Sequence, residues 1–283
     1  MDAVQSAGKL PSDHIRGRQA ATTNVRQTLI DLHCHVLPGI DDGPKTIEES
    51  IALGRAALAE GIRTIVATPH VSRRYRNGAS TIAALSYSVE KRFTEEDLPV
   101  EVCPGAEIAM TMAGSIAPED LQALTLGDGP WLLIECPFTP LATGFDLLLL
   151  GLQSRGHHIV LAHPERSPIF HRDPKMLGAF VRSGMLASVT AGSLVGRFGS
   201  EVRRFVLSLA QEDLLHNVAS DAHNLTSRPP GMRAELQEAG LDQLASWLTE
   251  AVPEAILGGE EIPPRPGVAI SVRATGRWWR RGN

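Results

Sequence analysis

The stretch "TLIDLHCHVLPGIDDGPKTIEESIALGRAALAEG", residues 28–61, decides the fold class of this chain. Its first part, "TLIDLH" (28–33), is a short apolar run that predicts a buried strand. The part "TIEESIALGRAALAEG" (46–61) predicts an amphipathic helix, because its apolar residues recur at helical spacing. Thr46 and Glu49 form a capping box at the start of this helix. A strand, a loop and a helix in this order make the repeating unit of an α/β protein.

The same unit recurs along the rest of the chain. Further strands are expected at 62–70, 100–108, 130–138, 158–165, 185–192 and 216–223, and further helices at 79–93, 144–156, 173–184, 199–213 and within 231–249. Strands interleaved with helices predict a parallel sheet with helices outside it. At 283 residues the chain has a length that α/β barrels reach as one domain. We therefore expect a single domain over 28–270, between a mobile extension (1–27) and a basic, aromatic tail (271–283).

The composition excludes several classes of protein. A net charge of -5 gives no general attraction to nucleic acid. The longest apolar run, "FDLLLLGL", is too short to span a bilayer, and the N-terminus lacks the apolar centre of a signal peptide. The three cysteines, Cys34, Cys103 and Cys136, are odd in number and lack Cys-x-x-Cys spacing, which fits a reducing compartment. We expect a cytoplasmic protein that neither binds nucleic acid nor inserts stably into a membrane.

Residues that can bind metal ions stand at the C-terminal ends of the predicted strands. They occur in "DLHCH", "ATPH", "PGAE", "IEC", "LAHPE" and "SDAH". In α/β barrels this end of the strands carries the active site. Alternate residues of a strand point to the same face, so His33 and His35 can reach one ion while Cys34 points away. The sequence therefore predicts a metal site at this end of the fold.

The number of candidate donors indicates more than one ion. A single tetrahedral zinc needs three or four ligands, whereas nine donors suggest two or three ions with a bridging carboxylate. A mixture of imidazole and carboxylate suits manganese, iron or zinc. The nine candidates are His33, His35, Asp42, His70, Glu107, Glu135, His163, Asp221 and His223.

The order of these motifs resembles a known family. "DLHCHVLPGIDDG", "ATPH", "PGAEI", "AHPER" and "SDAHN" resemble, in order, the motifs of the PHP (polymerase and histidinol phosphatase) superfamily. "HCHVLPGIDDG", followed by a T-x-E-E-S helix and by "SDAHNLTSRPPGM", is similar to the bacterial capsule- and exopolysaccharide-associated, manganese-dependent protein-tyrosine phosphatases. The resemblance covers roughly residues 28–250.

This resemblance implies a distorted (β/α)7 barrel, which is TIM-like, with a site for two or three metal ions at its C-terminal mouth. Manganese is the expected metal, with iron or zinc as alternatives. The implied ligands are His33, His35, Glu107 and Asp221 for the first ion, Asp42, His70 and His223 for the second, and Glu107 (bridging), Glu135 and His163 for the third. Asp42 matches the ligand spacing of the family's motif, so Asp41 is expected to cap or to support the site.

Two arginines and one loop complete the implied site. Arg166 in "AHPER" and Arg228 in "NLTSRPP" match positions at which the family holds phosphate, and a guanidinium suits phosphate oxygens. The loop "VSRRYRNG" (71–78) departs from the family's pattern. It is either a charged surface loop or a substrate-contacting lid that favours anionic peptides, in which case Arg73 and Tyr75 bind substrate.

The implied reaction is metal-assisted hydrolysis of phosphotyrosine in a protein, in which water attacks phosphorus in line. Asp42, Arg166 and Arg228 are the expected catalytic residues, and the implied partner is a bacterial tyrosine kinase of capsule or exopolysaccharide production. A PHP phosphatase for a small metabolite, such as histidinol phosphate or a sugar phosphate, is the first alternative. An amidohydrolase-like C–N hydrolase, whose metal-bridging lysine is not evident, and a metal-containing module without turnover are the others.

A cysteine-dependent phosphatase is excluded by spacing. Such enzymes need an arginine six residues after the nucleophilic cysteine. The residues at that distance from the three cysteines are Ile40, Ala109 and Ala142.

Overall fold

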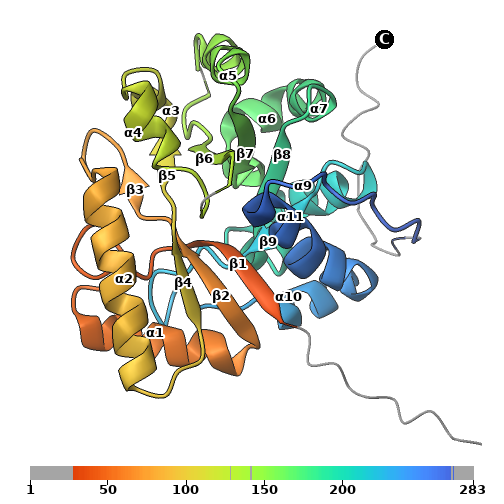
Figure 1. Ribbon diagram of the computed structural model, residues 1–283. Helices are drawn as coiled ribbons and strands as arrows, with labels where there is room; N and C mark the ends of the chain where they lie inside the picture. Colours follow the sequence, from red (N-terminus) through yellow and green to blue (C-terminus); the bar gives the residue numbers. More distant parts are fainter. Residues whose placement is uncertain (1–27, 128, 141, 269, 271–283) are drawn as a thin grey trace, which may run out of the picture.

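The computed structural model describes residues 28–127, 129–140, 142–268 and 270 (Figure 1). The expected N-terminal extension and the expected basic tail lie outside the described residues. Within them, no helix is both long enough and apolar enough to cross a membrane.

The strands form two sheets in which neighbours run parallel, which confirms the predicted α/β fold with parallel sheets. A three-stranded sheet has the order β1-β2-β4, with β1 (Leu29–Cys34), β2 (Ile62–Ala67) and β4 (Glu101–Pro104). A six-stranded sheet has the order β3-β5-β6-β7-β8-β9, with β3 (His70–Val71), β5 (Glu107–Ala109), β6 (Trp131–Glu135), β7 (His158–Ala162), β8 (Leu186–Thr190) and β9 (Asn217–Ala219).

Two of the predicted strands are each divided between the two sheets. The run 62–70 becomes β2 and β3, and the run 100–108 becomes β4 and β5. Pro69 lies at the first break, where it has no N–H to donate to a neighbouring strand. Gly105 lies at the second break, and a Cβ there would stand only 2.8 Å from a Val66 methyl carbon. The breaks place His70 and Glu107 side by side on the second sheet, paired in register.

The first strand of one sheet lies beside the last strand of the other. Cys34 at the end of β1 forms an isolated parallel bridge with Ala222, just beyond β9. The His35 N–H donates to the Ala222 carbonyl at 2.9 Å, and the Asp221 N–H donates to the His33 carbonyl at 2.8 Å. These hydrogen bonds bring residues 33–35 against residues 221–223, although nearly 190 residues of chain separate them.

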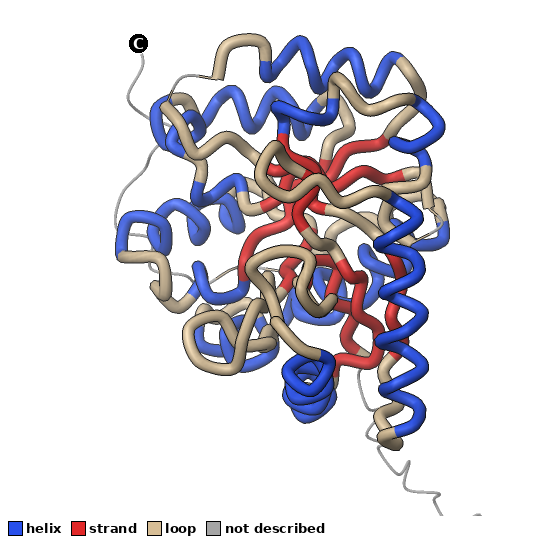
Figure 2. The backbone as a smooth tube through the Cα atoms, turned by 90° about the vertical axis from the view of Figure 1, so that its left-hand side faces the viewer, coloured by secondary structure: helices blue, strands red, loops and turns tan. Residues whose placement is uncertain are grey.

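Helices surround the strands (Figure 2). All five helices predicted before residue 231 are found where they were expected, as α1 (Ile47–Ala59), α2 (Ala79–Glu95), α5 (Phe145–Ser154), α7 (Pro174–Arg182) and α9 (Ser200–Gln211). Short helices that were not predicted follow several strands, namely α3 (Met110–Ala113), α4 (Pro118–Gln122), α6 (Pro168–Arg172) and α8 (Ala191–Leu194).

The prediction of one final helix within 231–249 was wrong. This segment consists of α10 (Arg233–Glu238), a 3-10 turn (Asp242–Leu244) and a π-helical turn (Trp247–Ala251), before α11 (Val252–Gly258). Gly240 has a φ of 73°, a left-handed conformation that ends a helix. The apolar periodicity of the segment continues across this break, so it did not reveal the interruption.

The helices pack closely on one another and on the strands. A Cβ at Gly54 of α1 would lie 2.4 Å from the ring of Phe93 on α2, so only glycine allows this approach. Phe93, Phe145 and Phe170 are fully buried between helices and strands. The packed core holds the strands in register, and their C-terminal ends carry the polar residues described next.

Candidate metal centre

All nine predicted donors lie at or shortly after the C-terminal end of a strand, although His70 and Glu107, which follow β2 and β4, are also the first residues of β3 and β5. Asp42 lies in the loop after β1, whereas the other donors lie on a strand or within a few residues of a strand end. Contacts among them connect the nine into one continuous group.

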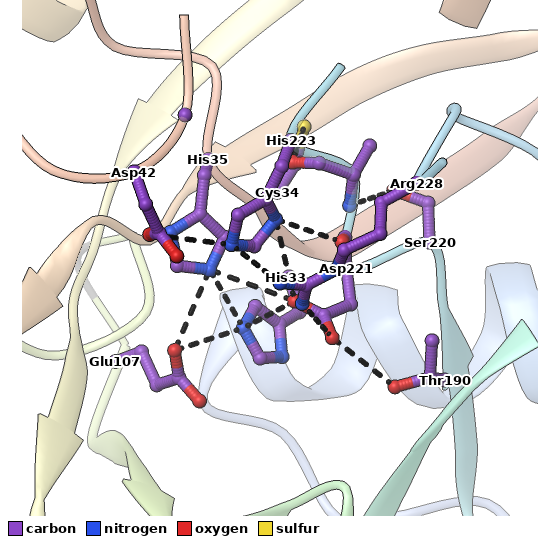
Figure 3. Close-up of polar contacts among 12 residues, drawn as sticks. His33, Cys34, His35, Asp42, Glu107, Thr190, Ser220, Asp221, His223 and Arg228 are labelled. Atoms are coloured by element: carbon purple, nitrogen blue, oxygen red, sulfur yellow. Dashed lines mark hydrogen bonds and ion pairs between the residues drawn. The ribbon is translucent and has the colours of Figure 1, made fainter. Parts of the chain in front are cut away.

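Three of the most buried donors, His33, His35 and Glu107, form a group of possible ligands for one ion, and Asp221 lies beside them (Figure 3). The Nε2 atoms of His33 and His35 are 3.3 Å apart. Glu107 Oε2 lies 3.4 Å from each of these nitrogens, and Asp221 Oδ1 lies 3.5 and 3.6 Å from them. The four side chains are at most 2% exposed. The separations among the His33, His35 and Glu107 atoms are those of ligands bound about 2.0–2.2 Å from one ion.

Two buried carboxylate oxygens of this cluster lack the partners that a bound cation would supply. In the described part of the chain, neither Glu107 Oε2 nor Asp221 Oδ1 accepts a hydrogen bond, although both are buried. A buried carboxylate oxygen without a partner is costly, and a divalent ion between these oxygens and the imidazoles would satisfy it. The donor set therefore fits a metal ion.

A second cluster opens towards solvent. Asp42 Oδ1 lies 3.4 Å from His70 Nε2 and 3.4 Å from His223 Nε2, and His35 belongs to the same group of possible ligands. The Asp42 side chain is 47% exposed, in contrast to the buried cluster. A hydrogen bond with His223 lowers the pKa of Asp42, against the opposing effect of partial burial.

A third cluster surrounds Glu107. His70 Nδ1 lies 2.9 Å from Glu107 Oε2, so His70 faces Asp42 with one nitrogen and Glu107 with the other. Glu135 joins these two residues in a group of possible ligands. His163 Nε2 lies 2.6 Å from Glu107 Oε1. Glu107 is thus the residue that contacts the most donors, as a bridging carboxylate would.

The pKa values show how strongly the clustered charges act on one another. Burial disfavours a proton on His35, but the hydrogen bond with Asp41 and the nearby Glu107 carboxylate outweigh this effect and raise its pKa to about 10. Burial, together with the Glu107 charge, raises the pKa of Glu135 to about 7. Burial and the Arg166 charge lower the pKa of His163 to about 4. Without a cation, His35 holds a proton that a bound ion would displace.

Asp41 orients the donors. The Nδ1–H of His35 donates to Asp41 Oδ2 at 2.7 Å, which leaves the Nε2 lone pair directed at the buried cluster. The backbone N–H of His70 donates to the same oxygen at 3.1 Å, and that of Gly43 donates to Oδ1 at 2.8 Å. A carboxylate behind a metal-binding imidazole fixes the tautomer and the ring orientation. The two adjacent acids therefore have different roles. Asp42 faces other donors, whereas Asp41 holds His35 and the His70 backbone in place.

Both predicted arginines contact Asp221. Arg166 Nη1 donates to Asp221 Oδ2 at 2.6 Å, and Arg228 forms an ion pair with the same oxygen. Arg228 also donates to His223 Nε2 at 2.9 Å. The two oxygens of Asp221 thus differ, because Oδ2 holds the guanidinium groups and Oδ1 faces the imidazoles. Two guanidinium groups consequently lie at the edge of the donor cluster.

Two buried acids that hold the strand ends together were missed by the sequence analysis. Asp31 accepts hydrogen bonds from the backbone and the hydroxyl of Ser220, next to Asp221, and burial raises its pKa to about 6. Glu165 accepts from the Thr190 N–H at 3.0 Å and from the Ser193 hydroxyl at 2.6 Å. The period-two series of residues 31, 33 and 35 was the signal that could have revealed Asp31, because all three share one face of β1.

Aromatic rings flank the cluster on two sides. The ring of Tyr75 stacks on His70 with centroids 5.7 Å apart, whereas no contact joins Arg73 to the nine donors in the described residues. Phe138, which the sequence analysis missed, stacks on His163 at 5.4 Å, and the Arg166 guanidinium lies 5.3 Å from its ring. Phe138 is 49% exposed, so part of its ring is accessible beside a candidate phosphate-binding arginine.

Comparisons with known proteins place this chain in a family. A family model described as "Capsular polysaccharide synthesis, CpsB/CapC" matches residues 29–241. The tyrosine-protein phosphatase YwqE of Bacillus subtilis is 40% identical over 249 residues, which are 84% of this chain and 96% of that protein. The putative tyrosine-protein phosphatase CapC of Staphylococcus aureus is 32% identical, over 71% of this chain and 79% of its own.

A solved structure is similar as well. It comes from a study of YwqE from Bacillus subtilis and CpsB from Streptococcus pneumoniae, described there as unique metal-dependent tyrosine phosphatases. Its TM-score is 0.71 at 35% sequence identity, and the match covers 85% of this chain and all of that chain (100%).

Proposed function

This chain belongs to the CpsB/CapC family of capsular polysaccharide synthesis, and from that premise we propose that it is a metal-dependent protein-tyrosine phosphatase. The observation that carries the proposal is the convergence of His33, His35, Glu107 and Asp221, with two arginines held on the far oxygen of Asp221. Such a site combines ligands for divalent ions with donors for a phosphate group.

We infer that two or three divalent ions bind here, with manganese expected first. The first would be held by His33, His35, Glu107 and Asp221. The second would be held by Asp42, His70 and His223, and the third by Glu107, Glu135 and His163. The ions supply positive charge that neutralises the phosphate and lowers the pKa of water.

The chain's own residues bind and orient the substrate. Arg166 and Arg228 donate to the phosphate oxygens, and a guanidinium stabilises the charge that develops on them. The exposed part of the Phe138 ring offers a surface for the ring of the tyrosine. Asp42 keeps a carboxylate at the solvent-exposed edge of the cluster, where water enters. The phenolate of tyrosine leaves with little need for a proton, because the pKa of its conjugate acid is about 10.

Further elements of the proposal follow the family resemblance. We infer that the two sheets close into the distorted (β/α)7 barrel, which is supported by the bridge between Cys34 and Ala222. A tyrosine kinase of capsule or exopolysaccharide production is the proposed source of the substrate, as the family description suggests. Such a kinase would place the enzyme in the cytoplasm.

The test uses the purified full chain with manganese, zinc or no added metal. Substrates are a phosphotyrosine peptide, the matching phosphoserine peptide and histidinol phosphate. We expect hydrolysis of the phosphotyrosine peptide that stops with a chelator and returns with manganese. A preference for histidinol phosphate would replace the proposal with a small-metabolite phosphatase. Full activity after exhaustive chelation would exclude the metal mechanism.

A further inference from the structure

An open groove of about 1130 Å³ begins one residue from the candidate metal centre. Val71, which follows His70, and Asn77 line one end of it. Its other wall is formed by α3, α4 and the residues around them, with apolar side chains such as Ile116 and Leu124. In Figure 1 the loop after β3 lies between the start of α2 and the short helices α3 and α4.

The loop 72–77 connects the groove to the metal centre. The Asn77 side chain donates to the carbonyls of His70, at 2.8 Å, and Ile40, at 3.0 Å. The Ser72 N–H donates to the Tyr75 carbonyl at 2.8 Å, which closes a tight turn. The Tyr75 ring packs on His70, while other residues of the same turn line the groove. A substrate in the groove would therefore continue towards the donors.

The charge of the groove is positive. Arg73 and Arg76 line it with Asp120 as the only acid among its lining residues. Within the residues that the structure describes, neither arginine has an ion-pair partner, and both are exposed. This contrasts with the chain as a whole, which has 32 acidic and 27 basic residues.

A smaller cavity beside the metal centre has no such excess of positive charge. It has a volume of about 420 Å³ and is lined by Asp42 and His223. Lys45 and Glu49 face it with opposite charges. Charge selection is therefore expected at the larger groove.

We propose that the groove binds the residues that flank the phosphotyrosine and selects acidic ones. This inference rests on the proposed phosphatase function. A carboxylate pairs with a guanidinium in a charge-assisted hydrogen bond, and the apolar wall accommodates the aliphatic parts of the peptide. The volume exceeds that of pockets for single small molecules, which hold about 300–1000 Å³, so the groove suits a peptide segment.

The experiment compares phosphotyrosine peptides of equal length whose flanking residues are all glutamate, all alanine or all lysine. For the wild-type chain with manganese, we expect kcat/KM for the glutamate peptide to exceed that for the lysine peptide roughly three- to tenfold at low salt. The preference should shrink at high salt, because exposed charges are screened. Fluorescence anisotropy of the same peptides, labelled and measured in a chelator, should show the same order of affinity.

The variant Arg73→Glu/Arg76→Glu should invert this preference, and Arg73→Gln/Arg76→Gln should abolish it. The matched control is Arg204→Glu on α9, because Arg204 is exposed and does not line the groove. This variant should prefer the glutamate peptide to the same degree as the wild-type chain. Hydrolysis of p-nitrophenyl phosphate, which has no flanking residues, reports on the metal centre itself. Circular dichroism verifies that each variant is folded.

Equal kcat/KM for the three peptides, or a preference that both double variants retain, would overturn the proposal for the groove. In either case the phosphatase proposal would still stand, because the peptides are hydrolysed. Failure of the wild-type chain to hydrolyse any phosphotyrosine peptide would instead contradict the phosphatase proposal.

Discussion

The two halves of the candidate metal centre differ in how the fold holds them. In the buried half, His33, His35, Glu107 and Asp221 are at most 2% exposed, and each lies on a strand or within two residues of a strand end. In the outer half, Asp42 is 47% exposed and lies in a loop. Strand register thus positions the buried donors, whereas turn contacts position the outer one.

Because of this difference, substitutions in the two halves of the metal centre should have unequal effects. A buried carboxylate that loses its charge leaves imidazoles and guanidinium groups without a counter-charge, and no water can replace it. An exposed carboxylate can be replaced in part by solvent. The predictions below test this comparison.

The largest effect is expected for Glu107→Gln, with Asp42→Asn as the matched change in the outer half. Glu107 contacts His33, His35, His70 and His163, so loss of its charge should reduce kcat/KM by roughly 10³-fold or more, a loss of several kcal/mol of charge stabilisation. Asp42→Asn should reduce it by about 10- to 100-fold.

Elemental analysis of both variants should show the greater loss of metal in Glu107→Gln. Equal loss of activity and metal in the two variants would remove the distinction between the halves.

The next effect concerns Asp41, which links the halves through His35 and the His70 backbone. Asp41→Asn should weaken metal binding or lower activity by about 10- to 100-fold, because the amide has no negative charge and only one acceptor oxygen for the N–H groups that the two carboxylate oxygens accept. Titration with manganese, followed by activity and by calorimetry, measures the change. Wild-type affinity in this variant would mean that packing alone orients His35.

A stability effect follows from His216, a partly buried imidazole outside the centre. Burial lowers its pKa to about 4, whereas neighbouring carboxylates raise that of His35 to about 10. In the unfolded chain this imidazole takes up a proton near pH 6.5, whereas in the folded chain it does so only near pH 4. The contribution of His216 to the free energy of unfolding is therefore fully present above pH 6.5 and is lost as the pH falls towards 4. Between pH 7.5 and 5 this group should cost about 2 kcal/mol.

His216→Gln should reduce that pH dependence, since glutamine keeps an acceptor for the Ala187 N–H and does not titrate. Urea unfolding of both proteins at the two pH values measures the difference. The same change in unfolding free energy between the two pH values in both proteins would show that His216 is protonated in the folded state or does not contribute to the pH dependence.

The smallest effect is expected for Phe138→Ala. An aromatic pair contributes about 0.5–1.5 kcal/mol, so kcat/KM for an aryl phosphate should fall roughly two- to tenfold. An alkyl phosphate should be affected less, because it has no ring to pack on Phe138. Phe138→Tyr should restore the selectivity. An equal fall for both substrates would mean that Phe138 acts only by supporting Arg166 and His163.

The sequence predicted most of the element order and the positions of the donors. Periodicity identified α1, α2 and β6 to β9 because each keeps one apolar pattern over its whole length. It did not identify the breaks at Pro69 and Gly105, since the apolar pattern continues through both. It also missed the short helices after the strands, because four or five residues show no period.

The site was predictable to the extent that it depends on residue type and local spacing. The pair His33 and His35 follows from the alternation of a strand, and the chain itself specifies that both imidazoles face one way. Asp41 was expected to cap or support the site, whereas Phe138 was not predictable in its observed role, because a lone aromatic residue gives no sign of its neighbours in space.

The sequence by itself thus determined the strand–helix order, the chemistry of the nine donors and their placement at strand ends, because these depend on interactions between near neighbours in the chain. Only the tertiary structure decided that His70 faces both Asp42 and Glu107, that one oxygen of Asp221 holds two arginines, and that the loop 72–77 joins the metal centre to a basic groove. Those contacts join residues far apart in sequence, and they arise where packed helices hold separate strand ends together.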